Sequence, residues 1–353
     1  MSRAVFRPDS SAACCRSHRT AGRIERLPAN EERVVDACLK PIGGQGRAVG
    51  EKGRDLRDHT AGAATEAFVA HRNLLFTVAY EMLGSAADAE DVLQETWLRW
   101  VKVDLEQVHD QRAYLVRITT RQSLNRLRSM KRRKEAYIGP WLPEPLLTAP
   151  DVAADVELAE SMSMALMLVL ETLSPTERAV FVLREVFDLG YDEVAAAVGK
   201  SPAAVRQIAH RARRHVKARR PRTRISPRQT RAALEAFHHA IETRNPQKLL
   251  NVLAPEVVLI SDGGGLKQAA LRPVTGCEKV ARMFLGGLGK VEGTLTGEPT
   301  VVNGNPALLV RLDGEIDGVL AVRVEDDRIT GLYYVRNPDK LTYLTSQTPL
   351  TLR

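Results

Sequence analysis

The sequence predicts a multidomain protein in which two all-α units are followed by an α+β domain. Apolar residues recur at helical spacing from residue 67 to about residue 134, and again from residue 154 to about residue 219. After Ser226, short runs of Val, Leu and Ile alternate with Asp-Gly, Asn-Gly and Asp-Asp turns, which is typical of strands. The length of 353 residues suits two or three domains.

Residues 1–64 have no sustained apolar period and many Arg and Gly, so we expect a disordered N-terminal extension. The cysteines Cys14, Cys15, Cys38 and Cys277 show no metal-ligand spacing and are interpreted as reduced thiols. We therefore expect no metal and no cofactor. No apolar run reaches the roughly 18 residues of a membrane helix, and the N-terminus lacks the apolar region of a signal peptide. The expected location is cytoplasmic, without a membrane partner.

The first helical unit is expected over residues 65–137. Gly84 to Ala87 breaks it before an acidic helix. On that helix Ala89, Leu93, Trp97 and Trp100 share one face, which predicts a core stripe. A second, acidic stripe holds Asp88, Asp91 and Glu95.

A basic helix is expected between Arg112 and Met130, where Tyr114, Leu115, Ile118, Leu124 and Leu127 recur at helical spacing. Positive charge lies along it at Arg112, Arg117, Arg121, Arg126, Arg128 and Lys131 to Lys134. A second basic cluster runs from Arg206 to Arg224, and the whole chain has a net charge of +8. Such clusters bind phosphates with release of counterions, which indicates a nucleic-acid partner.

A linker is expected over residues 138–153, because the prolines between Gly139 and Pro145 cannot continue a helix. The second helical unit is expected over residues 154–222. Its first helix is predicted from Ala154 to Leu173, and Ser174-Pro175 is the start signal of the next.

A helix-turn-helix pattern ends this unit. Tyr191 to Val198 forms the first helix, Gly199 to Pro202 the turn, and Ala203 to Val216 the second helix. The exposed side of the second helix is predicted to carry Ala203, Arg206, Gln207, His210 and Arg211. Arg and Gln there can donate two hydrogen bonds to a base edge in the major groove.

The α+β domain is expected over residues 228–345. It begins with two helical stretches. Candidate strands follow at Val257–Ser261, Pro299–Val302, Ala307–Leu312, Gly318–Glu325 and Ile329–Val335, with turns at Asn303-Gly304 and Asp326-Asp327.

Two stretches resemble sigma factors of bacterial RNA polymerase. The run Ala89 to Trp100, which reads AEDVLQETWLRW, closely resembles the core-polymerase-binding helix of extracytoplasmic-function sigma factors. The run Leu173 to Arg184, which reads LSPTERAVFVLR, resembles the start of sigma region 4. The resemblance implies that residues 65–137 are sigma region 2 and residues 154–222 are region 4. It implies a protein that binds core RNA polymerase and directs promoter recognition and transcription initiation.

The same resemblance implies specific contacts. Polymerase-binding residues, facing the clamp of the beta-prime subunit, would be Asp88, Asp91, Gln94, Glu95 and Trp97. The melted promoter and the minus-ten element would meet Arg112, Arg117, Arg121, Asn125, Arg126, Arg128, Lys131 and Arg132. The minus-thirty-five element would meet Ser201, Ala203, Arg206, Gln207, His210, Arg211 and Arg214.

Three further motifs resemble the SigJ-like subgroup, in which a SnoaL-like cone domain is fused to the C-terminus. They are Trp141, Leu142, Pro143, Glu144 and Pro145; Asp262, Gly263, Gly264 and Gly265; and Asn337, Pro338, Asp339, Lys340 and Leu341. In that subgroup the fused domain tunes sigma activity from within the chain. We hypothesise that the linker motif and the Asn337–Leu341 motif meet and set the spacing of the two DNA-binding units.

Two alternatives remain open. One is a one-component regulator with a helix-turn-helix and a ligand domain, although such a protein has no use for the acidic helix. The other is a SnoaL-like cyclase or isomerase, for which Asp262, Glu256, His238 and Tyr334 are the available groups. Because these do not form a spaced acid and base pair, we predict no catalytic residue and no enzymatic activity. An unknown small ligand of the C-terminal domain is a further candidate partner.

Overall fold

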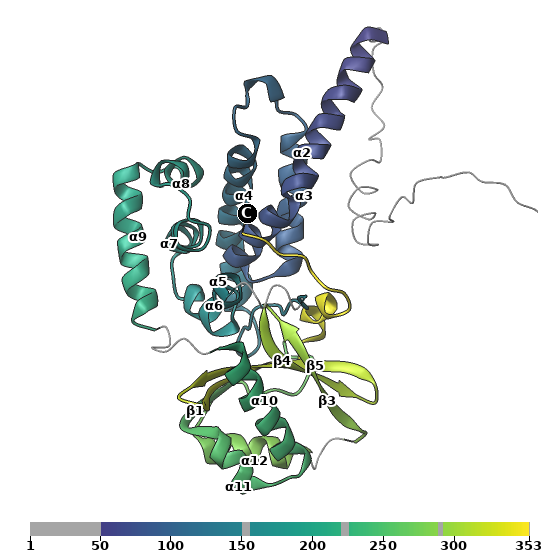
Figure 1. The fold of residues 1–353 in the computed structure, drawn as a ribbon, viewed down its shortest axis with the longest axis vertical. Helices are drawn as coiled ribbons and strands as arrows, with labels where there is room; N and C mark the ends of the chain where they lie inside the picture. The colour runs from purple at the N-terminus through teal and green to yellow at the C-terminus, as the bar shows by residue number, and fades with distance from the viewer. Residues whose placement is uncertain (1–50, 150–155, 220–225, 289–291, 353) are drawn as a thin grey trace, which may run out of the picture. The chain divides into compact units, whose positions relative to one another are not determined.

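The computed structural model describes residues 51–149, 156–219, 226–288 and 292–352 (Figure 1). Residues 1–50, with Cys14, Cys15 and Cys38, lie outside the described residues. Helix α2 spans Glu51–Leu83, so it includes residues 51–64 that the sequence assigned to the disordered extension. The stretch contains no Pro to stop a helix, which explains why it continues toward the N-terminus beyond the expected boundary.

The first helical unit consists of α2, α3 (Ala86–Trp100) and α4 (Gln111–Glu135), with a 3-10 turn at Leu105–Gln107. Ser85 caps α3 by accepting a hydrogen bond from the Asp88 backbone. Apolar side chains of the three helices, including Val78, Leu93 and Leu115, are fully or nearly fully buried. The unit predicted over residues 65–137 is therefore a three-helix core.

Residues 138–149 of the linker, the part that the structure describes, form no helix, as the prolines predict, and the second helical unit follows. The prediction of a single helix from Ala154 to Leu173 is wrong. It is broken into α5 (Val156–Ser161) and α6 (Met164–Glu171), because the Ser163 side chain accepts a hydrogen bond from the Leu166 backbone and starts a new helix.

The remaining helices of this unit follow the prediction. Helix α7 (Pro175–Phe181) begins with a capping box at Ser174 and continues into a π turn at Val182–Val186. Helices α8 (Tyr191–Val198) and α9 (Pro202–Lys217) form the helix-turn-helix, with Gly199 at a φ of 68° in the turn. Glycine adopts that left-handed backbone conformation with less strain than residues that carry a Cβ.

The C-terminal domain is a six-stranded sheet with helices α10 (Pro227–Glu242), α11 (Pro246–Val252) and α12 (Cys277–Leu288) on one face (Figure 1). Its strands are β1 (Leu253–Asp262), β2 (Val274–Thr275), β3 (Leu295–Val302), β4 (Asn305–Leu312), β5 (Glu315–Glu325) and β6 (Arg328–Val335). Their order is β2-β1-β6-β5-β4-β3, antiparallel except for β1 beside β6. All five predicted strands are present. The sequence missed β2, which has two residues, and α12, whose Gly286 and Gly287 lower helix propensity.

The sheet has two apolar faces. One packs on its own helices through residues such as Phe237, Leu259 and Leu332. On the other face, Val302, Val319 and Val335 pack with Leu142 of the linker and Met164 of α6. This second face places the C-terminal domain against the segment that joins the helical units. The fold class expected from the sequence is thus confirmed.

In the part of the chain that the structure describes, none of the helices has the length and apolar character needed to cross a membrane.

Candidate nucleic-acid interface and its linker junction

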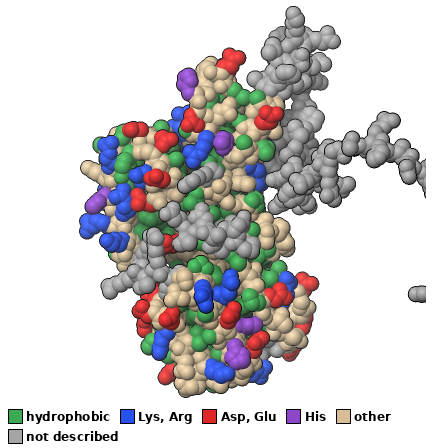
Figure 2. All heavy atoms as spheres, viewed as in Figure 1, with side chains coloured by type: hydrophobic (Ala, Val, Ile, Leu, Met, Phe, Trp, Pro, Cys, Tyr) green, Lys and Arg blue, Asp and Glu red, His purple; other side chains and the backbone are tan. Residues whose placement is uncertain are grey.

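Helix α9 separates a buried face from an exposed basic face. Val205, Ala209, Ala212 and Val216 are buried against the rest of the second helical unit. Every predicted contact of this unit is exposed, namely Ser201, Ala203, Arg206, Gln207, His210, Arg211 and Arg214. Lys, Arg and His side chains lie along the edge where Figure 1 draws α9 (Figure 2). The helix is therefore shaped to offer donors to a groove and positive charge to phosphates.

The basic face of α4 is only partly free. Arg121, Asn125, Arg128, Lys131 and Arg132 are exposed, whereas Arg112, Arg117 and Arg126 are half-buried. The Arg117 guanidinium lies 4.5 Å from the centre of the Tyr114 ring. Arg121 donates from Nη2 to the backbone oxygen of Ala196 in α8 at 3.0 Å. The N-terminal half of α4 thus faces the helix-turn-helix unit.

The acidic helix α3 exposes Asp91, Gln94 and Glu95, but Asp88 and Trp97 are buried. Trp97 packs against Phe68, with ring centres 5.3 Å apart, so it serves the core stripe. Its assignment to an exposed polymerase-binding surface is not supported by its position.

Asp88 is held by two arginines of α4. Arg126 donates from Nε at 2.6 Å and Arg133 from Nη2 at 2.8 Å, and Arg126 also pairs with Asp91. Burial raises the pKa of Asp88, but the hydrogen bonds from the two arginines outweigh it and leave the pKa below its ordinary value. Asp88 and Arg126, expected to meet the polymerase and DNA, here bind each other, because the acidic and basic helices pack side by side.

The three motifs of the SigJ-like resemblance meet at a buried ion pair. Lys340 donates from Nζ to Asp262 Oδ2 and to the Leu142 backbone oxygen, both at 2.7 Å. The Leu142 N–H donates to the same carboxylate oxygen at 2.8 Å. Burial lowers the pKa of Lys340 to about 8, opposed by Asp262. The hypothesis that the linker motif and the Asn337–Leu341 motif meet is confirmed.

Aromatic and glycine residues complete this junction. Tyr137 donates to Asp262 and accepts from Asn337 Nδ2 at 2.8 Å. The Lys340 ammonium lies 3.4 Å from the centre of the Trp141 ring, a cation–π contact. Gly264 has a φ of 61°, and a Cβ there would stand 2.4 Å from Asn337 Nδ2. Glycine is required at this position for both reasons.

A second junction fastens the linker to the start of α3. The Glu144 carboxylate accepts from the Ser85 hydroxyl at 2.8 Å and from the Ala86 backbone at 2.7 Å. The backbone N–H of Glu144 donates to the Gly84 backbone oxygen at 2.9 Å. Burial raises the pKa of Glu144, and these hydrogen bonds oppose the shift. A carboxylate at a helix N-terminus is also stabilised by the helix dipole.

The side chain of Asn303 contacts both helical units and the linker. Its Nδ2 donates to Tyr80 Oη of α2 at 3.0 Å and to the backbone oxygen of Met162 at 3.1 Å. Its Oδ1 accepts from the Leu146 N–H of the linker at 2.8 Å. The sequence identified Asn303 only as a turn residue, which its φ of 52° confirms. Asn303 and Tyr80 are 223 positions apart, so no local pattern could have revealed the contact.

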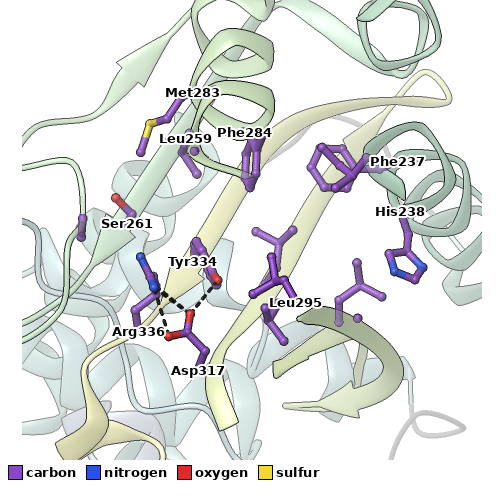
Figure 3. A pocket seen from close by; sticks show the side chains of 18 of the residues that line it. Phe237, His238, Leu259, Ser261, Met283, Phe284, Leu295, Asp317, Tyr334 and Arg336 are labelled. Carbon is purple, nitrogen blue, oxygen red and sulfur yellow. Dashed lines mark hydrogen bonds and ion pairs between the residues drawn. The ribbon is translucent and has the colours of Figure 1, made fainter. Parts of the chain in front are cut away.

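A cavity of about 910 Å³ lies between the sheet and the helices of the C-terminal domain. Of the groups weighed for catalysis, His238 and Tyr334 line it, Asp262 belongs to the junction, and Glu256 is exposed elsewhere. The sequence missed Asp317, which is 2% exposed and points toward Tyr334 and Arg336 in the cavity (Figure 3). It follows Ile316 in a strand that gave no local signal of a site.

Two families match the helical units. They are described as Sigma-70 region 2, over residues 67–133, and Sigma-70, region 4, over residues 163–216.

Relatives extend the similarity over the C-terminal domain. One from Mycobacterium tuberculosis (strain ATCC 25618 / H37Rv), described as ECF RNA polymerase sigma factor SigJ, is 37% identical over 78% of this chain and 92% of its own length. Another, from strain CDC 1551 / Oshkosh, is described as probable ECF RNA polymerase sigma factor SigI and is 32% identical over 80% of this chain and 96% of its own length. The crystal structure of the M. tuberculosis extracytoplasmic function sigma factor SigJ superposes with a TM-score of 0.64 at 33% identity, covering 81% of this chain and 100% of that one.

Proposed function

Since this chain belongs to the extracytoplasmic-function sigma factors of RNA polymerase, we propose that its C-terminal domain tunes promoter recognition by holding the linker between regions 2 and 4. As a member of the family it directs transcription initiation at promoters. Region 2 comprises α2 to α4, and region 4 comprises α5 to α9. A regulator with a helix-turn-helix alone would not match the region 2 family over residues 67–133.

Polymerase binding is assigned to the exposed part of α3. Asp91, Gln94 and Glu95 lie on its solvent side, where they can meet a basic surface of the beta-prime clamp. Asp88 and Trp97 act instead on the fold of region 2, the first by holding Arg126 and Arg133, the second by packing. We assign the minus-thirty-five element to the exposed face of α9 and the minus-ten element to the exposed end of α4.

Regions 2 and 4 pack together, and this supports a closed state. Arg121 of α4 contacts Ala196 of α8, and Lys134 at the end of α4 pairs with Glu171 of α6. Glu171 also accepts from Arg178 at 2.6 Å. While α8 lies on α4, Arg112 and Arg117 stay half-buried and Arg121 is engaged with Ala196, so this half of α4 is restricted in meeting promoter DNA. Transcription therefore needs the two regions to move apart.

The single observation that carries the proposal is the capture of the linker by the C-terminal domain. Leu142 is held by Asp262 and Lys340, Leu146 by Asn303, and Thr148 by the Val301 backbone at 3.1 Å. A fused domain holds its target at an effective concentration of about millimolar without competing for it in solution. These contacts restrain the separation of regions 2 and 4, and their loss releases it.

Run-off transcription tests this role. Purified full-length chain and a version ending near residue 224 are added to sigma-free bacterial core polymerase with genomic promoter fragments. Transcripts from both, with more from the shorter version, support restraint by the C-terminal domain. Equal transcription from the two versions would contradict the restraint, and no transcript from either would contradict the assigned polymerase and promoter contacts.

A further inference from the structure

The cavity of the C-terminal domain has the size and lining of a small-molecule site. Its volume of about 910 Å³ lies near the top of the range for cavities that hold drug-sized ligands. Phe237 and Phe284 meet edge to face in its wall, with ring centres 5.3 Å apart. Leu259, Leu308 and Leu320 form the floor on the sheet. This lining suits an aromatic or polycyclic body (Figure 3).

One end of the cavity is polar and built around the buried Asp317. Arg336 donates to it from Nε and Nη2 at 3.0 Å, and Lys267 donates from Nζ at 3.2 Å. Tyr334 donates to it at 3.3 Å, and in Figure 3 both Tyr334 and Arg336 point toward it. Asp317 thus receives four donors and is neutralised.

Donors remain free at this end of the cavity. A guanidinium carries five N–H groups, and Arg336 uses three, two toward Asp317 and one toward Gln268. Ser261, which accepts from the Ala270 backbone at 2.8 Å, keeps its hydroxyl hydrogen. Lys267 does not line the cavity, but it pairs with Asp317 as Arg336 does, so the cluster of these three side chains carries a net positive charge.

We propose that this cavity binds an aromatic or polycyclic acid, with the rings against Phe237, Phe284 and the leucine floor, and the anionic group beside Arg336 and Ser261. A charge-assisted hydrogen bond to an anion is about twice as strong as a neutral one, so the acidic group supplies specificity and the rings supply contact area.

The site is joined to the linker junction by shared backbone, and this step rests on the function proposed above. Ser261 and Asp262 are consecutive in β1, where neighbouring side chains point to opposite faces of the sheet. The backbone N–H groups of Arg336 and Asn337 both donate to the Asp262 backbone oxygen, at 2.7 and 3.0 Å. A ligand that moves Ser261 or Arg336 therefore moves Asp262, and with it the grip on Leu142.

Fluorescence binding with two probes of the same ring system tests the site on the full chain. The probes are 8-anilinonaphthalene-1-sulfonate, which carries an anion, and N-phenyl-1-naphthylamine, which does not. We expect saturable 1:1 binding, with the anionic probe bound roughly tenfold more tightly. Equal affinity for the two probes, or absence of saturable binding, would overturn the proposal.

Variants locate the binding. Leu295→Trp fills the cavity from β3, and Met283→Trp fills it from the exposed side of α12. At least one of these two variants should keep the circular dichroism spectrum of the wild type and bind both probes at least tenfold more weakly. Asp317→Asn combined with Arg336→Gln should abolish the preference for the anion. Arg311→Gln, which removes an ion pair to Glu298 on β3, is the matched control and should bind as wild type does. Unchanged binding in the folded filled variants would place the probe elsewhere and refute the site.

Run-off transcription separates this inference from the proposed function. The anionic probe should change transcript yield at least threefold with wild type and leave the yield of the filled variants unaltered. Binding without any change in yield would refute the coupling to Asp262 while leaving both the site and the sigma function standing. Loss of probe binding with normal transcription would refute the site alone.

Discussion

Lys340 and Asp262 form an ion pair in which the side chains are 3% and 0% exposed and the charged atoms lie 2.7 Å apart. The pair joins β1 to the end of the C-terminal domain and holds the backbone of Leu142 between them. Removing one partner of a buried ion pair leaves the other charge without compensation, which typically costs about 3–5 kcal/mol.

We therefore expect Lys340→Met to lower the free energy of unfolding by about 3–5 kcal/mol. The double variant, which adds Asp262→Asn, removes both charges and should lower the free energy of unfolding less than Lys340→Met alone. Urea unfolding of the wild type and the two variants gives the comparison. A double variant at least as unstable as the single one would show that the charges do not depend on each other.

The Asn303 side chain can be tested separately from its turn. Asn303→Asp keeps a residue that tolerates positive φ and keeps an acceptor, but it removes the donors to Tyr80 and Met162. Hydrogen exchange of residues 141–149 should become at least tenfold faster, because the linker loses its anchor. Asp326→Asn changes another turn residue of positive φ, far from the linker in the sheet, and is the control. Unchanged linker exchange in Asn303→Asp would argue against this anchor.

Glu81 should make stability depend on pH. Burial raises its pKa from 4.5 to about 7, and the hydrogen bond from Ser161 and the charge of Arg178 only partly oppose this. The folded state then holds a proton that the unfolded state releases, so stability is full below pH 4.5, falls as pH rises through about 7, and is flat above it. The slope within the window is about 1.4 kcal/mol per pH unit.

Glu81→Gln mimics the protonated form and should be more stable than wild type at pH 8 by about 1–3 kcal/mol, with little difference at pH 4.5. Urea unfolding at both pH values measures it. Glu95→Gln changes an exposed side chain of α3 and should follow wild type at both. A Glu81→Gln variant less stable than wild type at pH 8 would contradict the raised pKa.

Arg206 and Arg214 should affect DNA binding in different ways. Both are exposed on α9, Arg206 near its start and Arg214 in its last turn. Arg206→Ala should weaken the free energy of DNA binding by about 1–3 kcal/mol and relax the sequence preference at one base pair. Arg214→Ala should weaken binding to all DNA sequences alike. It should also reduce by about 1 the slope of the logarithm of the binding constant against the logarithm of the salt concentration. Fluorescence anisotropy on a set of single-substituted promoter fragments distinguishes them, and equal effects of the two changes on preference would contradict the assignment.

The sequence predicted those parts of the protein that depend on local periodicity. Val205, Ala209 and Val216 repeat with the helical period, so the two faces of α9 were predictable. Strands β3 and β5 end in turns with Asn-Gly and Asp-Asp, which have their own backbone signature. The break at Ser163 was missed, because a serine inside an apolar pattern can either face solvent or cap a new helix.

The site depended on contacts that are distant in sequence. Asp88 and Arg126 each look like surface charges, and only the packing of α3 on α4 turns them toward each other. Trp97 could serve the core or a partner until Phe68 was placed beside it. Asp317 and Asn303 acquire their partners through the sheet, from β6 and from α2. The motifs around Leu142, Asp262 and Lys340 were recognised by resemblance, but their bonds required the structure.

Locking region 2 to region 4 tests whether the two regions must separate for transcription. Ala113 and Glu193 line the same small gap between α4 and α8. Cysteines at these two positions, in a chain whose four native cysteines are serine, are joined by a short bismaleimide before run-off transcription with sigma-free core polymerase. We expect the joined protein to lose transcription, while the two single-cysteine proteins treated in the same way keep it. Undiminished transcription by the joined protein would show that regions 2 and 4 need not separate, and would contradict the proposed restraint.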